Sequence, residues 1–299
     1  MFIIKFRALF FTLSAVFVGL AITAMVVWGF NFGIDFKGGS ILEVVYPSER
    51  PSAEVLKVEI EKLALGSYTL QPVGDKNYVV RTKELSNTEK ESLIGIMKMG
   101  GSVDIAQFNS IGPVVGNELK NKSYVAIGIV LIGIVLFVTF AFRKVSKPVS
   151  SWKYGLATIV ALAHDVVVPA GAYITWIAFR GGEIDLLFLT ALLAILGYSV
   201  HDTIVVFDRV RENLRVNKDM GVKESFDETV GKSVSQTFGR SINTSLTIFL
   251  VLLALYVWGA ESTRNFSFVL LVGIIAGTYS SIFLASPLLV LFEKIQKKA

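Results

Sequence analysis

The sequence contains no cysteine and only two histidines among its 299 residues. Without cysteine the chain has no disulfides, no zinc–thiolate site and no thiol nucleophile. The two histidines, His164 and His201, follow no HExxH or other ligand-spaced pattern, which argues against a zinc site. A Walker A phosphate-binding motif is also missing, which disfavours direct use of ATP. We therefore expect no metal site and no organic cofactor.

Charge is also scarce. Charged residues make up 18% of the chain, hydrophobic residues make up 53%, and the mean hydropathy is +0.61. A soluble domain averages about one quarter charged residues, so this composition favours a membrane protein. The net charge of +5 raises the alternative of nucleic-acid binding. We expect none, because the basic residues lie in short segments beside apolar runs, where they are typical of membrane proteins.

Six apolar segments reach the length of about 20 residues that a membrane-spanning helix needs. The first could be part of a cleaved signal peptide, but it is longer than a typical signal core and lacks a small-residue cleavage site. We therefore predict a retained helix there. The six predicted spans are Ala8–Phe30, Tyr124–Phe142, Tyr154–Phe179, Ile184–Phe207, Ile242–Trp258 and Phe266–Phe292.

Lysine and arginine near the ends of these segments predict their orientation. Basic residues precede the first span, fill the connection between the second and third, and close the chain; they also gather in residues 208–240, a predicted cytoplasmic loop. They include Lys5, Arg7, Arg143, Lys144, Lys147, Lys153, Arg209, Arg211 and Lys294. Both termini are therefore predicted to be cytoplasmic. Within the loop, Phe226, Val230, Val234 and Phe238 recur every four residues, which predicts a separate amphipathic helix on the bilayer or the bundle base.

The connection 31–122 is predicted to form an extracytoplasmic domain. It carries 11 basic and 12 acidic residues, and long loops cross the membrane largely regardless of charge. Its pattern predicts the order βαββαβ, the ferredoxin-like arrangement, with a capping box from Thr88 to Glu91. The predicted elements are Ser40–Tyr46, Ala53–Leu65, Tyr68–Val73, Tyr78–Thr82, Thr88–Met99 and Ser102–Asn109. The remaining parts are residues 1–30, with the first span, and residues 123–299, with the other five.

Polar residues inside the predicted spans are the candidate functional groups. A charged residue near the centre of a membrane helix costs roughly 2.5–3.5 kcal/mol, so Asp202 indicates a functional site. Asp202 lies 18 residues from Ile184, and Arg240 lies 18 residues before Trp258. Both depths are about 27 Å, which predicts an Asp202–Arg240 pair. Separating the pair would favour protonation of Asp202, and reuniting it would favour proton release.

A second polar layer is predicted about 21 Å from the outer side, because Asp165 and Thr244 each lie 14 residues from the outer end of their span. Asn243 and His164 are adjacent to these residues in sequence. Other interpretations stay open. Arg240 could be an interfacial anchor, His201 is favoured as a packing donor, and Asp165 could be a structural partner of His164 or of the fifth span.

Three motifs give the chain a family resemblance. They are FGIDFKGG at residues 32–39, GYSVHDTIVVFDRVREN at 197–213 and RSINTS at 240–245. In their order and in the six-span layout, the chain resembles the SecF family, the smaller membrane subunits of the bacterial SecDF accessory complex. Two positions depart from the commonest pattern: Lys37 replaces a frequent Thr, and His201 replaces a frequent Asn. The glycines Gly38 and Gly39 could form a hinge or a tight turn.

The resemblance implies a polytopic α-helical protein whose six spans form half of an RND-like transporter, with a small α+β domain between the first and second spans. It implies a multi-pass protein of the bacterial inner membrane that uses the proton-motive force with SecD to promote preprotein export. Asp202 and Arg240 match proton-pathway residues of the family, and Asp165 matches a further acidic position. Protons would be the coupling ion.

The implied partners are a SecD-like subunit, the SecYEG channel, unfolded preproteins and membrane lipid, with YajC and YidC as further candidates. The chain is accordingly expected to be a translocation subunit and not an enzyme. Two competing functions stay open: a half-size RND-type proton-driven exporter of small molecules or lipids, and a non-transporting scaffold of the translocon.

Overall fold

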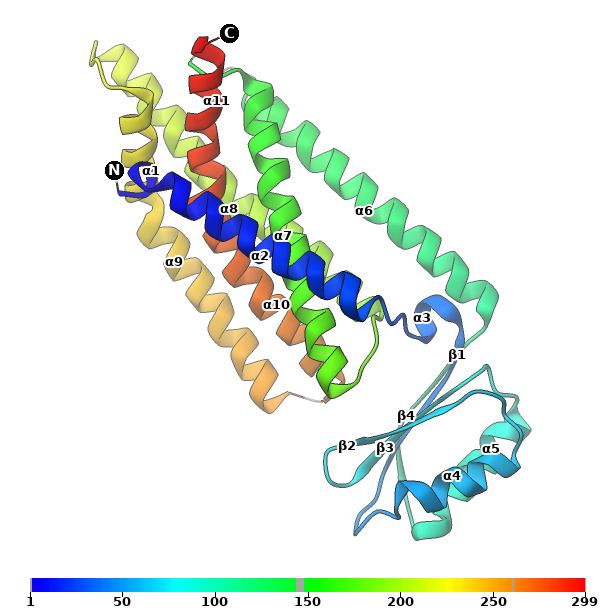
Figure 1. The fold of residues 1–299 in the computed structure, drawn as a ribbon. Helices are drawn as coiled ribbons and strands as arrows, with labels where there is room; N and C mark the ends of the chain where they lie inside the picture. Colours follow the sequence, from blue (N-terminus) through cyan, green and yellow to red (C-terminus); the bar gives the residue numbers. More distant parts are fainter. Residues whose placement is uncertain (1, 144–147, 260, 299) are drawn as a thin grey trace. The chain divides into compact units, whose positions relative to one another are not determined.

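The computed structural model describes residues 2–143, 148–259 and 261–298, so the predicted basic residues Lys144 and Lys147 lie outside the described residues. The chain divides into two compact units. A bundle unit comprises Met1–Phe30, Ala126–Arg180 and Leu187–Ala299, and a sheet unit comprises Asn31–Val125 and Gly181–Leu186. Figure 1 shows the helices of the first and the strands of the second.

Six helical segments of the described chain are long and apolar enough to span a membrane, which confirms the predicted polytopic architecture. Helices satisfy their backbone hydrogen bonds internally, as a segment in lipid must. The first five are α2 (Arg7–Trp28), α6 (Pro113–Ala141), α7 (Ser151–Arg180), α8 (Leu186–Asp219) and α9 (Phe226–Trp258). The sixth is Thr263–Gln296, formed by α10 (Glu261–Ser280), the π-helical turn η2 (Ser281–Ala285) and α11 (Ser286–Lys298).

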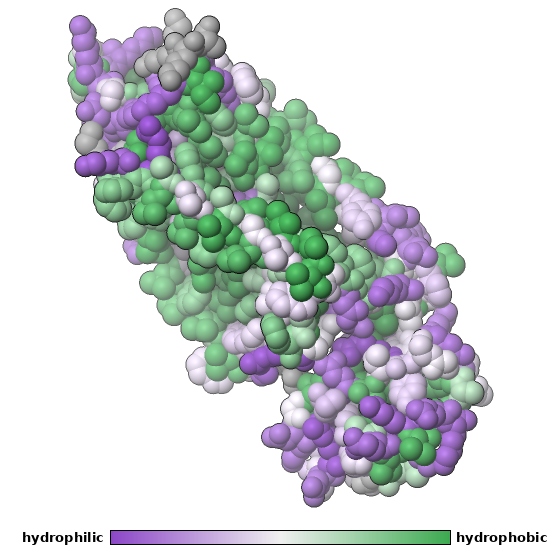
Figure 2. All heavy atoms as spheres, in the orientation of Figure 1, coloured by the Kyte–Doolittle hydropathy of each residue, from purple (hydrophilic) through white to green (hydrophobic). Residues whose placement is uncertain are grey.

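The centre of the bundle unit is formed by α7, α8 and the α10–η2–α11 segment. These helices bury half or more of their most apolar stretch, whereas α2, α6 and α9 bury less than a fifth of theirs. The exposed apolar surface of the outer helices is suited to lipid, and apolar side chains cover much of the visible face of this unit (Figure 2).

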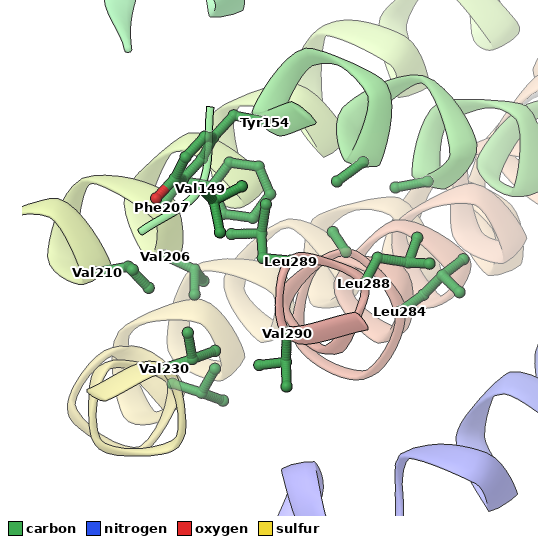
Figure 3. Packing of buried hydrophobic residues seen from close by; sticks show 14 of the residues in the cluster. Val149, Tyr154, Val206, Phe207, Val210, Val230, Leu284, Leu288, Leu289 and Val290 are labelled. Carbon is green, nitrogen blue, oxygen red and sulfur yellow. The ribbon is translucent and has the colours of Figure 1, made fainter. Parts of the chain in front are cut away.

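Aromatic packing fixes one end of the bundle core. The Phe142 and Tyr154 rings are stacked with their centroids 5.1 Å apart, and Phe207 meets Tyr154 edge-on at 5.4 Å. Val206, Val230, Leu289 and their neighbours complete this core (Figure 3). Residues from α7, α8, α9 and α11 thus share one buried cluster.

The predicted separate helix in residues 208–240 is wrong. The α8 helix continues to Asp219 and α9 begins at Phe226, so only residues 220–225 connect them. The apolar face of the predicted helix does pack on the bundle, as one of the two predicted alternatives had it, because Phe226, Val230 and Val234 are buried in the bundle core. The apolar spacing belongs to the first turns of α9, which start with a capping box between Ser225 and Glu228. Each helix therefore extends well beyond its apolar segment.

The chain termini and the start of α9 lie at one end of the bundle unit. Asp227 forms ion pairs with Arg7 at 3.6 Å and with Lys294 at 2.8 Å. The short helix α1 (Phe2–Lys5) lies at the same end (Figure 1). Three segments predicted to share one side of the membrane are therefore in contact.

The sheet unit has the predicted βαββαβ order. Its antiparallel sheet has the strand order β2-β3-β1-β4, which confirms the ferredoxin-like arrangement. The elements are α3 (Ile34–Lys37), β1 (Gly39–Val45), α4 (Ala53–Lys62), β2 (Thr69–Val73), β3 (Asn77–Thr82), α5 (Asn87–Met97), η1 (Lys98–Gly100) and β4 (Asp104–Ile111). Leu42, Val44 and Val80 point to one face and pack with Leu56 and Leu93 of the helices. The capping box of α5 joins Ser86 and Glu89, two residues earlier than predicted.

The sheet unit also contains a segment that the sequence did not assign to it. Gly181–Leu186, between α7 and α8, belongs to this unit although it lies far from residues 31–122 in sequence. Phe32 and Ile184 form a parallel bridge. The unit is therefore built from two separate stretches of chain.

Candidate functional site: two buried aspartates

Asp165, on α7, is fully buried within the bundle unit. Its Oδ2 accepts a hydrogen bond from Ser280 Oγ at 2.6 Å and a very short one from Ser199 Oγ, while His164 Nδ1 lies 2.9 Å from Oδ1. Hydrogen bonds to a charged group contribute about 1.5–3 kcal/mol each, more than neutral ones. Hydroxyls from α8 and α10, and the imidazole of the preceding residue on α7, thus hold this carboxyl group.

Asp202, on α8, is also buried, with 6% of its surface exposed. Ser241 of α9 donates a hydrogen bond to its Oδ1 at 2.6 Å, whereas Oδ2 is buried without a hydrogen-bond partner among the described residues. A buried carboxylate with an incomplete set of partners is costly when ionised, and proton uptake relieves that cost. One oxygen of the Asp202 carboxyl group is therefore left without a hydrogen-bond donor among the described residues.

A run of hydroxyl groups lies between the two aspartates. Ser199, Asp202 and Thr203 occupy one buried face of α8, as residues three and four apart do. Thr203 Oγ1 lies 2.8 Å from Ser281 Oγ, and Ser281 follows directly after Ser280, the donor to Asp165. The polar interior therefore continues from one carboxyl group to the other along α8 and the sixth span.

The π-helical turn η2 places these serines. The turn spans Ser281–Ala285, and the Ser286 side chain closes it, because its Oγ donates a hydrogen bond to the Ser281 carbonyl oxygen at 2.9 Å. Such turns insert a residue into an α-helix and are frequent at functional sites. Ser280 and Ser281 stand at the start of this turn, which brings adjacent residues to Asp165 and Thr203.

The predicted Asp202–Arg240 ion pair is not formed. Arg240 is exposed on α9 and makes no ion pair within the described chain, while the next residue, Ser241, faces Asp202. Each residue rotates a helix by about 100°, so equal depth does not give equal direction. His201 is likewise exposed, beside the buried Asp202.

The predicted second layer is also corrected. Asn243 and Thr244 are exposed on α9, and Asp165 instead contacts Ser199, Ser280 and His164. His164 is the partner that the sequence suggested, and its ring stacks on Tyr279 with the centroids 5.8 Å apart. Its Nε2 is buried without a hydrogen-bond partner among the residues described.

The serines were missed because single hydroxyls in apolar helices are common packing residues. Ser199 had a usable signal, since it lies three residues before Asp202 on the same helical face. Ser280 and Ser281 had no such signal, because no acidic residue lies near them in the sequence.

Gly38 and Gly39 form a close turn before β1. Both have positive φ angles, +78° and +135°. An added Cβ would lie 2.7 Å from the Pro113 Cα at Gly38 and 2.6 Å from the Thr82 carbonyl oxygen at Gly39. Turn geometry and packing thus account for both glycines, and a hinge role stays a prediction.

Comparisons with known proteins agree on one family. The model described as "Protein export membrane protein SecD/SecF, C-terminal" matches residues 94–295, and the SecD/SecF GG motif matches residues 23–46. The second match includes Gly38 and Gly39. The first match includes both buried aspartates and the four helices, α7, α8, α9 and α10, that supply their hydrogen-bond partners.

Named relatives and a solved structure extend the match. The chain is 40% identical to protein translocase subunit SecF of Thermobaculum terrenum, over 97% of this chain and 93% of the relative. It is 35% identical to SecF of Anaerolinea thermophila, over 96% and 92%. The crystal structure of Thermus thermophilus SecDF matches 97% of this chain with a TM-score of 0.83 and 31% identity, and this chain spans 38% of that one. The chain therefore belongs to the SecF family of protein translocase subunits.

Proposed function

We propose that this chain is a proton-coupled subunit of protein export that works with a SecD-like partner. It uses the proton-motive force to promote movement of unfolded preproteins across the bacterial inner membrane. Asp202 and Asp165 exchange protons in this cycle. Both termini lie on the cytoplasmic side, as the positions of the basic residues favour.

The pair of buried carboxyl groups carries this proposal. Asp165 and Asp202 lie within spanning helices, and serine hydroxyls, with one imidazole at Asp165, are their hydrogen-bond partners. Asp165 has three such partners, and a purely structural Asp202 would be expected to have a cation or several donors as well. Asp202 Oδ2 instead has no such partner within the described residues. Intramembrane carboxyl groups of this kind are typical of proton relays.

The exposed polar residues support a partner subunit. Arg240, Asn243 and His201 lie on outward faces of α8 and α9, although both helices are apolar enough to span the membrane. Charged groups facing lipid are expensive, so these faces are expected to contact protein or water. A SecD-like subunit is proposed to cover them, since the matched SecDF chain is much longer than this one.

Arg240 then has a conditional role. It is one residue from Ser241, the hydroxyl that donates to Asp202. A rotation of α9 by about 100° would exchange the two side chains at the carboxylate. Such a rotation would supply a cation and favour release of the proton. On the family resemblance alone, the proposal extends to SecYEG as the channel, with YajC and YidC as additional partners.

Replacing Asp202 by Asn tests the proposal. The variant is reconstituted with a SecD-like subunit and the translocon in vesicles with an imposed proton gradient. Asp208→Asn is the matched control, because Asp208 is exposed on the same helix and pairs with Arg211 at the surface. We expect Asp202→Asn to abolish the gradient-dependent part of export and Asp208→Asn to preserve it.

Normal gradient-dependent export by an assembled Asp202→Asn complex would contradict proton coupling at this residue and would favour a translocon scaffold. Export of a small molecule or lipid that is lost in the same variant, with preprotein export unchanged, would favour a half-size exporter. Assembly is measured by co-purification of the two subunits.

A further inference from the structure

The connection between α7 and α8 is built into the sheet unit by backbone pairing. We call Gly181–Leu186 the strap. Ile184 N–H donates to the Asn31 carbonyl at 2.8 Å, and Gly33 N–H donates to the Ile184 carbonyl at 2.9 Å. Asn31 Nδ2 also donates to the Gly182 carbonyl at 3.0 Å. The strap is thus an extra extended segment beside the chain that leads into β1.

An ion pair adds a side-chain contact to the strap. Arg81 of β3 lies with Nε 3.2 Å from Glu183 Oε2, and both side chains are about one fifth exposed. Burial raises the pKa of Glu183, and the nearby Arg81 opposes that rise. Gly181 has a φ of +76°, and an added Cβ there would overlap the Gln71 side chain. Gly181 and Glu183 of the strap therefore both contact side chains of the sheet strands β2 and β3.

Asp35 holds the point where the strap becomes helix α8. Its Oδ2 accepts a hydrogen bond from the Leu186 backbone N–H at 2.8 Å, across 151 positions of sequence. Leu186 is the first residue of α8. The first N–H groups of a helix lack internal partners, and a carboxylate there is favoured by the helix dipole. Asp35 thus acts as a cap supplied from another part of the chain.

We propose that Asp35 is a positioning residue for Asp202. Asp35 fixes the axial position and rotation of the start of α8, and Asp202 lies on the same helix 16 residues later. That separation is about 24 Å of continuous helix, so a shift of the first turn is carried to the buried carboxyl group. Asp35 is half-buried, and the contact is made with a backbone N–H group.

The proposal rests on the proposed function, because it takes Asp202 as a proton-exchanging group. Glu183 and Asp35 then have separate tasks. Glu183 keeps the strap on the sheet, and Asp35 connects the strap to the helix.

The test uses the full chain with its SecD-like partner in nanodiscs. A hydrophobic carbodiimide modifies protonated carboxyl groups, and the pH midpoint of its reaction at Asp202 is read by peptide mass spectrometry. Asp35→Ala removes the cap, Asp35→Asn keeps an acceptor, and Ser86→Ala is a control that breaks a capping box elsewhere in the sheet unit. Amide exchange at the first turn of α8 reports the cap directly.

We expect Asp35→Ala to speed exchange at the first turn of α8 and to shift the Asp202 midpoint by about half a pH unit or more, the size of a modest change in surroundings. Asp35→Asn should restore most of both values, and Ser86→Ala should leave both unchanged. Faster exchange with an unshifted midpoint, or unchanged exchange, would overturn the proposal. If Asp35→Ala fails to fold, Asp35→Ser provides the same comparison, because its shorter side chain cannot bridge to the Leu186 N–H in the way the Asp35 carboxylate does.

The strap proposal and the proposed function fail in distinguishable ways. An Asp202 that does not react across the pH range, in a complex whose export survives Asp202→Asn, contradicts the proposed function. If, in such a complex, Asp35→Ala changes amide exchange only at the first turn of α8, the positioning role of Asp35 is overturned as well. An Asp202 that titrates with the same midpoint in wild type and Asp35→Ala contradicts only the strap proposal.

Discussion

Replacing Phe207 by Ala tests whether the aromatic cluster stabilises the bundle core. Phe207 is fully buried and meets the rings of Tyr154 at 5.4 Å and Phe142 at 6.0 Å. Truncating a buried Phe typically costs 3–5 kcal/mol, roughly, through lost contacts and a residual cavity. Each aromatic pair adds about 0.5–1.5 kcal/mol beyond area burial. Lipid is as apolar as the core, so the transfer part of this cost is small in a membrane and the packing part remains; we therefore expect a loss at the lower end, about 3 kcal/mol.

Phe137→Ala is the matched control on α6. Phe137 is 58% exposed, so its removal should change the free energy of unfolding by no more than about 0.5 kcal/mol. The free energy of each purified variant is measured by denaturant titration in bicelles. Equal losses for the two variants would refute the packing argument. A loss for Phe207→Ala below about 1 kcal/mol would also refute it, because no cavity would then have formed.

Three other predictions concern the sheet unit. Hydrogen bonds from the Ser86 backbone and the Lys83 side chain lower the pKa of Glu89 to about 2. The ionised Glu89 side chain therefore stabilises the folded state above pH 4.5, and this stabilisation is lost as the pH falls from 4.5 to about 2. Glu89→Gln should therefore flatten the fall in α5 amide protection on acidification, and an unchanged slope would count against the capping box. Burial raises the pKa of Glu183, so the protonated side chain stabilises the folded state. This stabilisation is fully present below pH 4.5 and is lost as the pH rises through the folded-state pKa. The melting temperature of Glu183→Gln relative to wild type should accordingly be higher at pH 7 than at pH 4; the reverse order would show that the Arg81 pair outweighs burial. Gly39→Ala should destabilise the sheet unit by about 1–3 kcal/mol, because its φ is +135° and a Cβ would meet the Thr82 carbonyl. Gly95 lies in helix α5 with open space around it, so Gly95→Ala should stabilise the sheet unit by about 1 kcal/mol. Equal changes in the free energy of unfolding for Gly39→Ala and Gly95→Ala would contradict the argument from turn geometry.

Much of the fold could be predicted because hydropathy and periodicity are strong signals. All six spans and the βαββαβ order follow from apolar runs and alternating strands. The helix ends did not follow, because α8 and α9 continue as polar helices beyond their apolar segments. Arg209 to Asp219 carries too many charges to resemble a span, and yet its helix is continuous with the one in the membrane. A hydropathy window detects the membrane-crossing part of a helix and not its whole length.

The site was predicted by depth but not by direction. Rise per residue placed Asp202 and Arg240 at one level, and the structure places Ser241 at the carboxylate instead. Which side chain faces inward depends on rotation about the helix axis and on neighbouring helices. Ser280 and Ser281 lie at the start of a π-helical turn that no pattern in the sequence indicated. The strap was missed because its pairing joins Asn31 and Ile184, which are far apart in sequence.

The most direct test of the central claim is to observe the proton on Asp202. Difference infrared spectroscopy of the reconstituted complex, recorded between high and low pH, reports carboxyl groups through their C=O stretch. We predict a band in wild type and in Asp208→Asn that is absent in Asp202→Asn. A spectrum that is identical in all three proteins would contradict proton exchange at Asp202.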